Sequence, residues 1–289
     1  MNKFLYNIYI VTRARVYVKK KCVQYLDNSL KNRYNIVVSL NGEKEKSMET
    51  LNDRIKIDAH VHSSGVSKCS VTTCQQIVDI KKAQGYDGVI LTNHCQSWYY
   101  EPPFHAAFMR KAVEEYHAMR AYASTLDFRV LLGLEVTLLK PVLSDWLLYG
   151  ATEAFLLQSP CLHALTQKEL FRYCEENGVV MVQAHPFRHG GAIKERMLNT
   201  SVEHMHGIEI NCTPCDLENW EAVTETAEKY NLLVTCGTDF HAADRTFRGG
   251  MFVPNWVNTA EDFGKHLKET PKTEIFLEEK YLALPNQKK

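Results

Sequence analysis

Short apolar runs alternate with helix patterns between residues 54 and 255, and this alternation limits the possible folds more than any other feature. Val179–Gln183 is a run typical of a buried strand. The segment before it, 165–177, has a helix pattern in which Thr166 and Glu169 form a capping box. Repeated strand and helix units over about 200 residues predict an α/β architecture with a parallel sheet or barrel.

The expected elements follow one another in regular order. We expect strands at 55–57, 88–92, 128–133, 146–149, 179–183, 207–211 and 232–236. We expect helices at 70–84, 104–124, 165–177 and 219–230.

Potential metal ligands stand just after the expected strands. His60 and His62 lie two residues apart, so on a strand they point to the same face. In α/β barrels the functional groups collect at the carboxyl ends of the strands. We therefore expect one mouth to gather His60, His62, His94, Glu135, His185, Asp239 and His241.

The chemistry of this set points to divalent cations. Imidazole and carboxylate groups suit zinc, manganese and iron. A carboxylate such as Glu135 can bridge two cations, and paired cations suit the hydrolysis of phosphoesters. A single histidine is usually an ordinary hydrogen-bonded or surface residue, so the prediction depends on the convergence of the whole set.

Five short motifs occur in a fixed order. They are D-x-H-x-H at 58–62, T-N-H at 92–94, G-x-E at 133–135, A-H-P at 184–186 and G-T-D-x-H at 237–241. This ordered set resembles the PHP (polymerase and histidinol phosphatase) superfamily. The resemblance implies a distorted (β/α)7 barrel, similar to a TIM barrel, with two or three divalent metal ions (Zn, Mn or Fe) at the carboxyl ends of the strands. Members hydrolyse phosphomonoesters such as histidinol phosphate, and others are domains of bacterial DNA polymerases.

The resemblance also implies which residues hold each metal. The first metal would take His60, His62, Glu135 and Asp239. Glu135 would bridge to a second metal, which also takes His185. A third metal would take His94 and His241, and either histidine that is free of metal could protonate the leaving alkoxide.

The chain departs from the family pattern at two places. Glu153 and His163 are both candidates for a further ligand of the second metal, and we prefer Glu153 because it follows the expected strand at 146–149. Ser67 and Lys68 stand where the family often has an acid or a histidine for the third metal.

Neighbouring residues suggest supporting roles. Cys69 could substitute for the missing third-metal ligand, although we interpret it as a buried structural thiol. Asn93 replaces the usual aspartate and could orient His94 by hydrogen bonding. Arg188 is our first choice for a phosphate contact, because a guanidinium binds phosphate with two donors.

The leading functional hypothesis is a hydrolase, namely a metal-dependent phosphoesterase that acts on a small phosphomonoester and is similar to histidinol phosphatase. The alternative is a non-catalytic metal-binding barrel that works as a regulatory or nucleic-acid-associated module. Hydrolysis of a C–N bond ranks third, because the carboxylated lysine of amidohydrolases has no clear counterpart here.

Composition divides the chain into two parts. Residues 1–47 carry a net charge of +7 and the remainder −7, although the whole chain is neutral. We predict an N-terminal extension at 1–50 and the catalytic barrel at 51–289. A basic segment can contact nucleic acid, but we prefer to interpret this one as a solvated extension. The sequence does not set the oligomeric state. Scattered cysteines indicate a reducing, cytoplasmic location, and no apolar run is long enough to span a membrane.

Overall fold

The computed structural model describes residues 54–188, 200–217, 219–270 and 273–278, together with the backbone of three short segments near the N-terminus. These segments are β1 (Asn7–Val11), β2 (Val16–Tyr17) and β3 (Ile36–Val37). The predicted boundary between residues 50 and 51 lies outside the described residues. The division into extension and barrel therefore stays a prediction.

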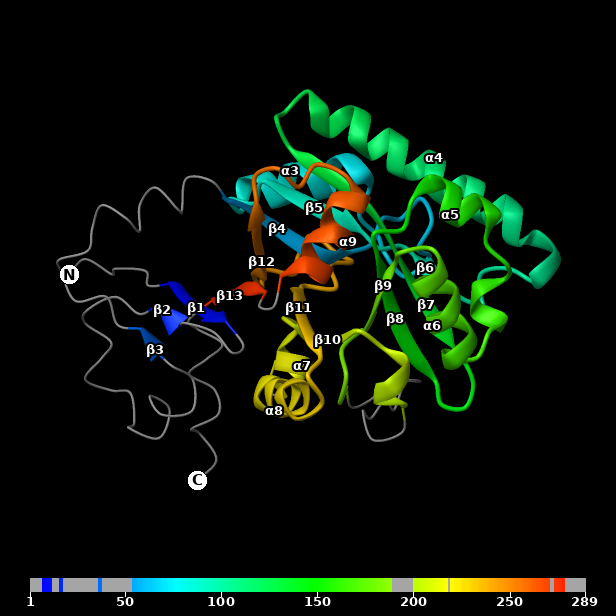
Figure 1. The fold of residues 1–289 in the computed structure, drawn as a ribbon. Coiled ribbons are helices and arrows are strands. Elements are labelled where there is room, and N and C mark those ends of the chain that lie inside the picture. The colour runs from blue at the N-terminus through cyan, green and yellow to red at the C-terminus, as the bar shows by residue number, and fades with distance from the viewer. Residues whose placement is uncertain are drawn as a thin grey trace.

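Seven strands of the described region form a barrel that is nearly closed (Figure 1). In order around the barrel they are β4 (Arg54–Val61), β5 (Gly88–Leu91), β7 (Arg129–Leu138), β8 (Ser144–Tyr149), β9 (Val180–Gln183), β10 (Gly207–Asn211) and β11 (Leu233–Gly237). The predicted distorted (β/α)7 barrel is thus confirmed.

One strand departs from the parallel arrangement that the sequence pattern predicted. β8 runs antiparallel to both β7 and β9, whereas the other neighbours in the barrel pair in parallel. The link between β7 and β8, residues 139–143, is too short to hold a crossover helix, so the chain must turn back as a hairpin. This reversal is the distortion of the barrel.

Further strands extend the framework. The two-residue strand β6 (His94–Cys95) pairs with the far end of β7. On the other side, β12 (Gly249–Pro254) pairs antiparallel with β4, and β13 (Glu274–Glu278) pairs with β12. The N-terminal strand β1 continues this antiparallel extension beside β13.

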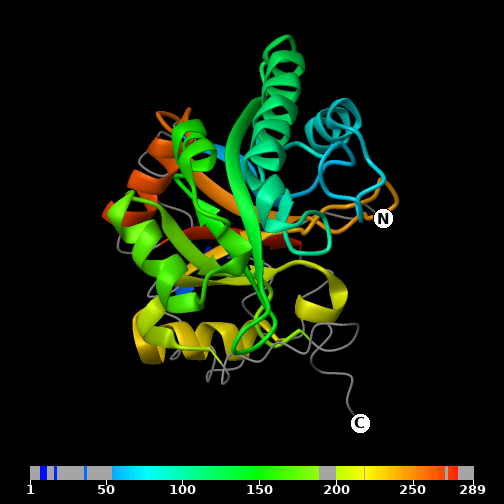
Figure 2. The same cartoon turned by 90° about the vertical axis from the view of Figure 1, so that its right-hand side faces the viewer.

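Helices cover the outside of the barrel (Figures 1 and 2). The longer ones are α3 (Cys74–Ala83), α4 (His105–Ser124), α6 (Gln167–Glu176), α8 (Trp220–Tyr230) and α9 (Ala260–Glu269). The shorter helical elements are η2 (Pro102–Phe104), α5 (Glu153–Gln158), η3 (Leu162–Ala164), η5 (Val202–His204) and α7 (Pro214–Leu217). The predicted capping box at Thr166 and Glu169 is confirmed at the start of α6. Among the described residues, every helix is too short or too polar to cross a membrane.

The barrel closes where β11 returns to β4. The backbone N–H of His62 donates to the carbonyl of Phe240 at 2.9 Å, and the N–H of Phe240 donates to the carbonyl of His60 at 3.2 Å. These bonds join the first motif of the chain to the last. They place both motifs at the same end of the barrel.

A buried ion pair strengthens this seam. The Lys81 ammonium lies 2.6 Å from the Asp58 carboxylate, and both side chains are fully buried. Lys81 also donates to the Thr238 hydroxyl at 3.0 Å, and the Thr238 N–H donates to Asp58 at 3.0 Å. Burial lowers the pKa of Lys81, while the charge of Asp58 opposes that shift.

Replacing Asp58→Asn should destabilise the barrel by about 3 kcal/mol, because it leaves the Lys81 charge buried without its counter-ion. The free energy of unfolding in urea measures this change. Asp244→Asn, at an exposed position, should change it by less than about 0.5 kcal/mol. Equal stability of the two variants would contradict the role given to the ion pair.

Candidate metal centre

The structure gathers the seven side chains that the sequence placed after the strands. His60 lies near the end of β4 and His62 just beyond it. His94 begins β6, and Glu135 lies within β7. The others follow the ends of β9 and β11, and these are His185, Asp239 and His241.

Glu135 occupies the middle of the cluster. Its Oε1 atom lies 3.0 Å from His185 Nε2 and 3.4 Å from His60 Nε2. Its Oε2 atom lies 2.7 Å from His94 Nδ1 and 3.4 Å from His62 Nε2. The two oxygens therefore face different histidines, as a carboxylate that bridges two cations would.

Asp239 contacts the cluster from the opposite side of the barrel seam. Its Oδ1 atom lies 3.2 Å from His62 Nε2, 3.5 Å from His60 Nε2 and 3.2 Å from His241 Nδ1. Its Oδ2 atom accepts a hydrogen bond from Arg188 Nη2 at 2.7 Å. Asp239 thus links the histidines of the cluster to the Arg188 guanidinium.

Hydrogen bonds on the far side of two rings fix the direction of their lone pairs. His60 Nδ1 donates to Glu209 Oε1 at 2.9 Å, since a carboxylate can only accept. The Ser67 hydroxyl donates to Asn93 at 2.8 Å, so it accepts from His62 Nδ1 at 3.3 Å. Neutral rings held in this way carry their lone pairs on Nε2, which points into the cluster.

Buried polar atoms in the cluster make no well-aligned hydrogen bond within the described part of the chain. They include Nε2 of His60, Nε2 of His62 and Oε2 of Glu135. A buried polar atom without a partner costs about 1–3 kcal/mol, so native structures rarely keep several together. Divalent cations would satisfy these atoms, and the donor set fits such ions.

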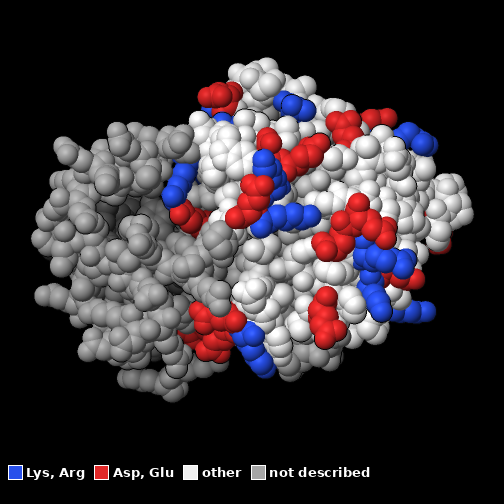
Figure 3. All heavy atoms as spheres, in the orientation of Figure 1, with Lys and Arg blue, Asp and Glu red and all other residues white. Residues whose placement is uncertain are grey.

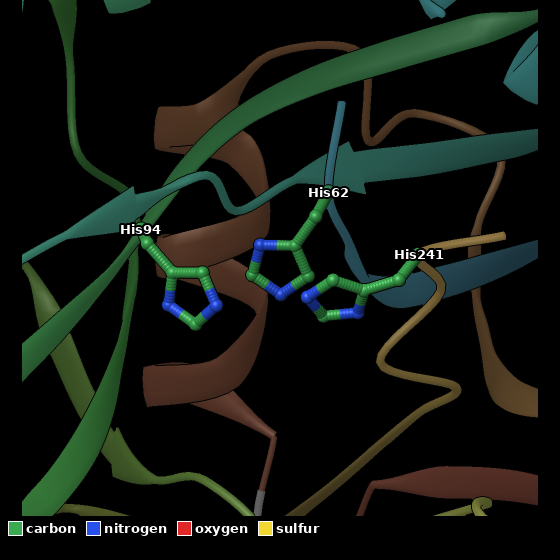
Figure 4. Close-up of side chains that lie close together, drawn as sticks. All are labelled: His62, His94 and His241. Carbon is green, nitrogen blue, oxygen red and sulfur yellow. The ribbon is translucent and has the colours of Figure 1, made fainter. Parts of the chain in front are cut away.

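The outer half of the cluster consists of three histidine rings (Figure 4). The His62 ring lies between those of His94 and His241, with ring centroids 4.3 Å from each.

The interpretation of Cys69 as a buried thiol is wrong. Cys69 is exposed, and its Sγ atom lies 3.1 Å from His241 Nε2.

The surrounding charges set the protonation of the cluster. Burial alone would lower the pKa of His60, but Glu209, Glu135 and Asp239 outweigh it and raise that pKa to about 10. Burial lowers the pKa of His62 well below its usual value, and the neighbouring rings of His241 and His94 add to this effect. A cation that binds His60 must therefore displace a proton from it at neutral pH.

The carboxylates of the cluster are stabilised as anions. Burial would raise the pKa of Glu135, but the histidines around it hold that pKa well below its usual value. Asp239 behaves in the same way, owing mainly to His241 and Arg188. Both side chains are therefore available as charged ligands.

The backbone is strained at two of the candidate ligands. His185 has a φ of 30° and Asp239 a φ of 50°. Side chains other than glycine rarely adopt positive φ, and such residues concentrate at functional sites. The strain supports a role for both positions in the site.

The structure does not bring Glu153 or His163 to this cluster. Glu153 begins α5, and its half-exposed carboxylate pairs with His117 at 3.1 Å. His163 packs against the ring of Tyr100. Asp145 lies beside the cluster instead, with its carboxylate 3.9 Å from His185 Nε2. Together with Glu135 and His185 it forms a group that could hold a metal ion.

Sequence reasoning missed two acidic residues beside the cluster. Asp145 is a buried carboxylate within the apolar strand 144–149, and Glu209 has the same setting in 207–211. A charged residue inside a run typical of a buried strand was the signal that could have found both. Glu209 accepts hydrogen bonds from the His185 N–H at 2.9 Å as well as from His60.

Residues predicted to support the ligands lie close to them. Asn93 contacts His94 indirectly, through Ser67. The Ser67 hydroxyl donates to Asn93 Oδ1 at 2.8 Å and accepts from the His94 N–H at 3.0 Å. The Arg188 guanidinium binds Asp216 through Nε and Nη2, at 2.9 and 2.7 Å. The guanidinium also donates to Asp239. The predicted contact between Arg188 and a phosphate therefore stays a proposal.

Comparisons with known proteins support the fold. No protein-family model matches the chain, and no curated protein matches it significantly. A two-domain protein from Bacteroides vulgatus, described as containing a predicted PHP-like metal-dependent phosphoesterase, has a similar structure with a TM-score of 0.50 and 19% identity. The match covers 75% of this chain and 62% of that one, so this chain spans less than two thirds of that protein.

A second similar structure is PsfC from Pseudomonas syringae, with a TM-score of 0.53 and 21% identity over 77% of this chain and 91% of that one.

Fold and site together define a mixed α/β barrel with a histidine and carboxylate cluster at its mouth. This chain shares the fold of a protein described as containing a predicted PHP-like domain, so the predicted resemblance is confirmed at the level of fold.

Replacing Glu209→Gln should weaken metal binding about 10–100-fold, because it removes the carboxylate that orients His60. Calorimetric titration with Zn²⁺ or Mn²⁺ measures the affinity. Glu175→Gln is the matched control, since Glu175 accepts from His206 at 2.6 Å at an exposed position. Wild-type affinity in the Glu209 variant would contradict the role of this carboxylate.

Proposed function

We propose that this chain is a metal-dependent phosphoesterase that hydrolyses a small phosphomonoester with a metal-activated water. The observation that carries the proposal is the convergence of histidines and carboxylates around Glu135, in which Nε2 of His60 and of His62 faces the carboxylates without a well-aligned hydrogen bond among the described residues. Histidinol phosphate is the specific substrate that we would test first.

The contacts described above support the proposed ligand sets. His60, His62, Glu135 and Asp239 would hold the first cation. Glu135 would bridge to a second cation, bound also by His185 and, in place of Glu153, by Asp145. His94 and His241 would hold a third.

Divalent cations at these positions would supply Lewis acidity that activates water and neutralises charge on the phosphoryl group. The chain itself would orient the substrate and move protons. Arg188, held by Asp216, would present its guanidinium to a phosphate oxygen. His241 or His94, when free of metal, would give a proton to the leaving alkoxide.

Figure 3 shows the distribution of charged side chains on one face of the molecule. On this face, acidic and basic side chains of the described residues are interspersed. A nucleic-acid interface would instead gather basic side chains on one face. The described residues of this face therefore form no basic patch of that kind.

Purified protein with Mn²⁺ or Zn²⁺ should hydrolyse p-nitrophenyl phosphate and at least one member of a phosphomonoester panel that includes histidinol phosphate. Glu135→Gln should lower kcat/KM by about 100-fold or more, since it removes the charge of the bridging carboxylate. Steady-state kinetics measure this, with circular dichroism to check folding.

Glu175→Gln serves as the control and should keep full activity. Tight metal binding without turnover of any phosphomonoester would count against the proposal and favour a non-catalytic barrel. Turnover that is unchanged by chelators would also contradict it.

A further inference from the structure

The loop after His62 places a thiol at the outer face of the cluster. Cys69 is exposed, and its Sγ atom lies 3.1 Å from His241 Nε2. Tyr99 fixes the position of this residue, because its hydroxyl donates to Sγ at 3.2 Å and accepts from the Cys69 N–H at 3.2 Å. The thiol is therefore held beside the cluster and open to solvent.

The nitrogen that faces this thiol carries a lone pair. His241 Nδ1 donates to the carbonyl of Asp239 at 2.8 Å, since a carbonyl oxygen can only accept. The neutral ring then has its lone pair on Nε2, directed at Cys69. The next ring inward, His62, is fully buried, and its Nε2 atom has no aligned partner among the described residues.

The spacing suits two ligands of one ion. A tetrahedral zinc ion with usual bond lengths separates a thiolate sulfur from an imidazole nitrogen by about 3.5 Å. The observed 3.1 Å between Cys69 and His241 is within a few tenths of an ångström of that value. A small movement of an exposed side chain would let both bind the same cation.

The two loop residues before Cys69 offer no anionic ligand. Ser67 hydrogen-bonds to His62 and Asn93, and Lys68 lies over the Tyr99 ring at 5.3 Å. Neither side chain offers an anion to the outer histidines. Cys69 is the neighbouring residue of the loop that can supply one.

We propose that the thiolate of Cys69 ligates the divalent cation held by His94 and His241. The inference rests on the proposed function, because it requires the cluster to bind metal. On binding, the thiol loses its proton to solvent and the sulfur forms a bond to the cation. A thiolate is a softer ligand than a carboxylate, so the outer site should prefer Zn²⁺ to Mn²⁺.

Titration of the full-length protein with Co²⁺ tests this ligand directly. Wild type should show visible cobalt bands and a near-ultraviolet band from sulfur-to-cobalt charge transfer. Cys69→Ser should lose the near-ultraviolet band and keep the visible bands. Cys161→Ser is the matched control, because Cys161 lies 3.4 Å from His163 Nε2 outside the cluster, and it should keep both.

The outcomes separate this inference from the proposed function. Visible bands without the charge-transfer band in wild type would overturn ligation by Cys69 and leave the metal site intact. A charge-transfer band that persists in Cys69→Ser would also overturn it. No cobalt binding at all would overturn the proposed function and this inference together.

A second measurement needs no variant. Zn²⁺ should protect Cys69 from iodoacetamide in the wild-type protein, as followed by peptide mass spectrometry, because a metal-bound thiolate is a poorer nucleophile. Cys161 should react at the same rate with and without Zn²⁺. Equal reactivity of Cys69 in both conditions, at saturating Zn²⁺, would overturn the inference.

Discussion

The candidate site depends on the closure of β4 against β11. Backbone hydrogen bonds between His60, His62 and Phe240 join segments that are about 180 residues apart. The buried pair of Asp58 and Lys81 strengthens the same seam. Because the first and last motifs meet there, two histidines of one strand and the aspartate of another can face Glu135.

Burial gives this arrangement its chemical character. Charged groups away from water are stable only when they are paired or bound to metal. Here Glu135 and Asp239 are compensated by surrounding imidazoles and by Arg188. Glu209 accepts a hydrogen bond from Nδ1 of His60, so the Nε2 atom of His60 faces the carboxylates. This arrangement of histidines and carboxylates suits divalent cations.

The sequence predicted the barrel and seven clustered residues because both depend on local patterns. Buried strands appear as apolar runs, and the candidate ligands stand just after them. Glu153 was preferred on the assumption that a strand at 146–149 ran parallel and ended at the mouth. β8 instead runs antiparallel, so its first residues, including Asp145, lie near His185.

Other features depend on contacts that sequence spacing does not encode. Glu209 accepts a hydrogen bond from the His60 ring, although the two residues are 149 positions apart in the sequence. The exposure of Cys69 depends on how its loop folds over Tyr99. The expected strands end at residue 133 and begin again at residue 146, so the short link that reverses β8 emerges only in the structure, where both strands are longer.

The most direct test of the account is anomalous diffraction from crystals grown with Zn²⁺ or Mn²⁺. The account predicts at least two anomalous peaks within bonding distance of the cluster, one beside His60 and His62 and one beside His185, with Glu135 between them. An ordered, metal-soaked crystal with no anomalous peak at these side chains would contradict it.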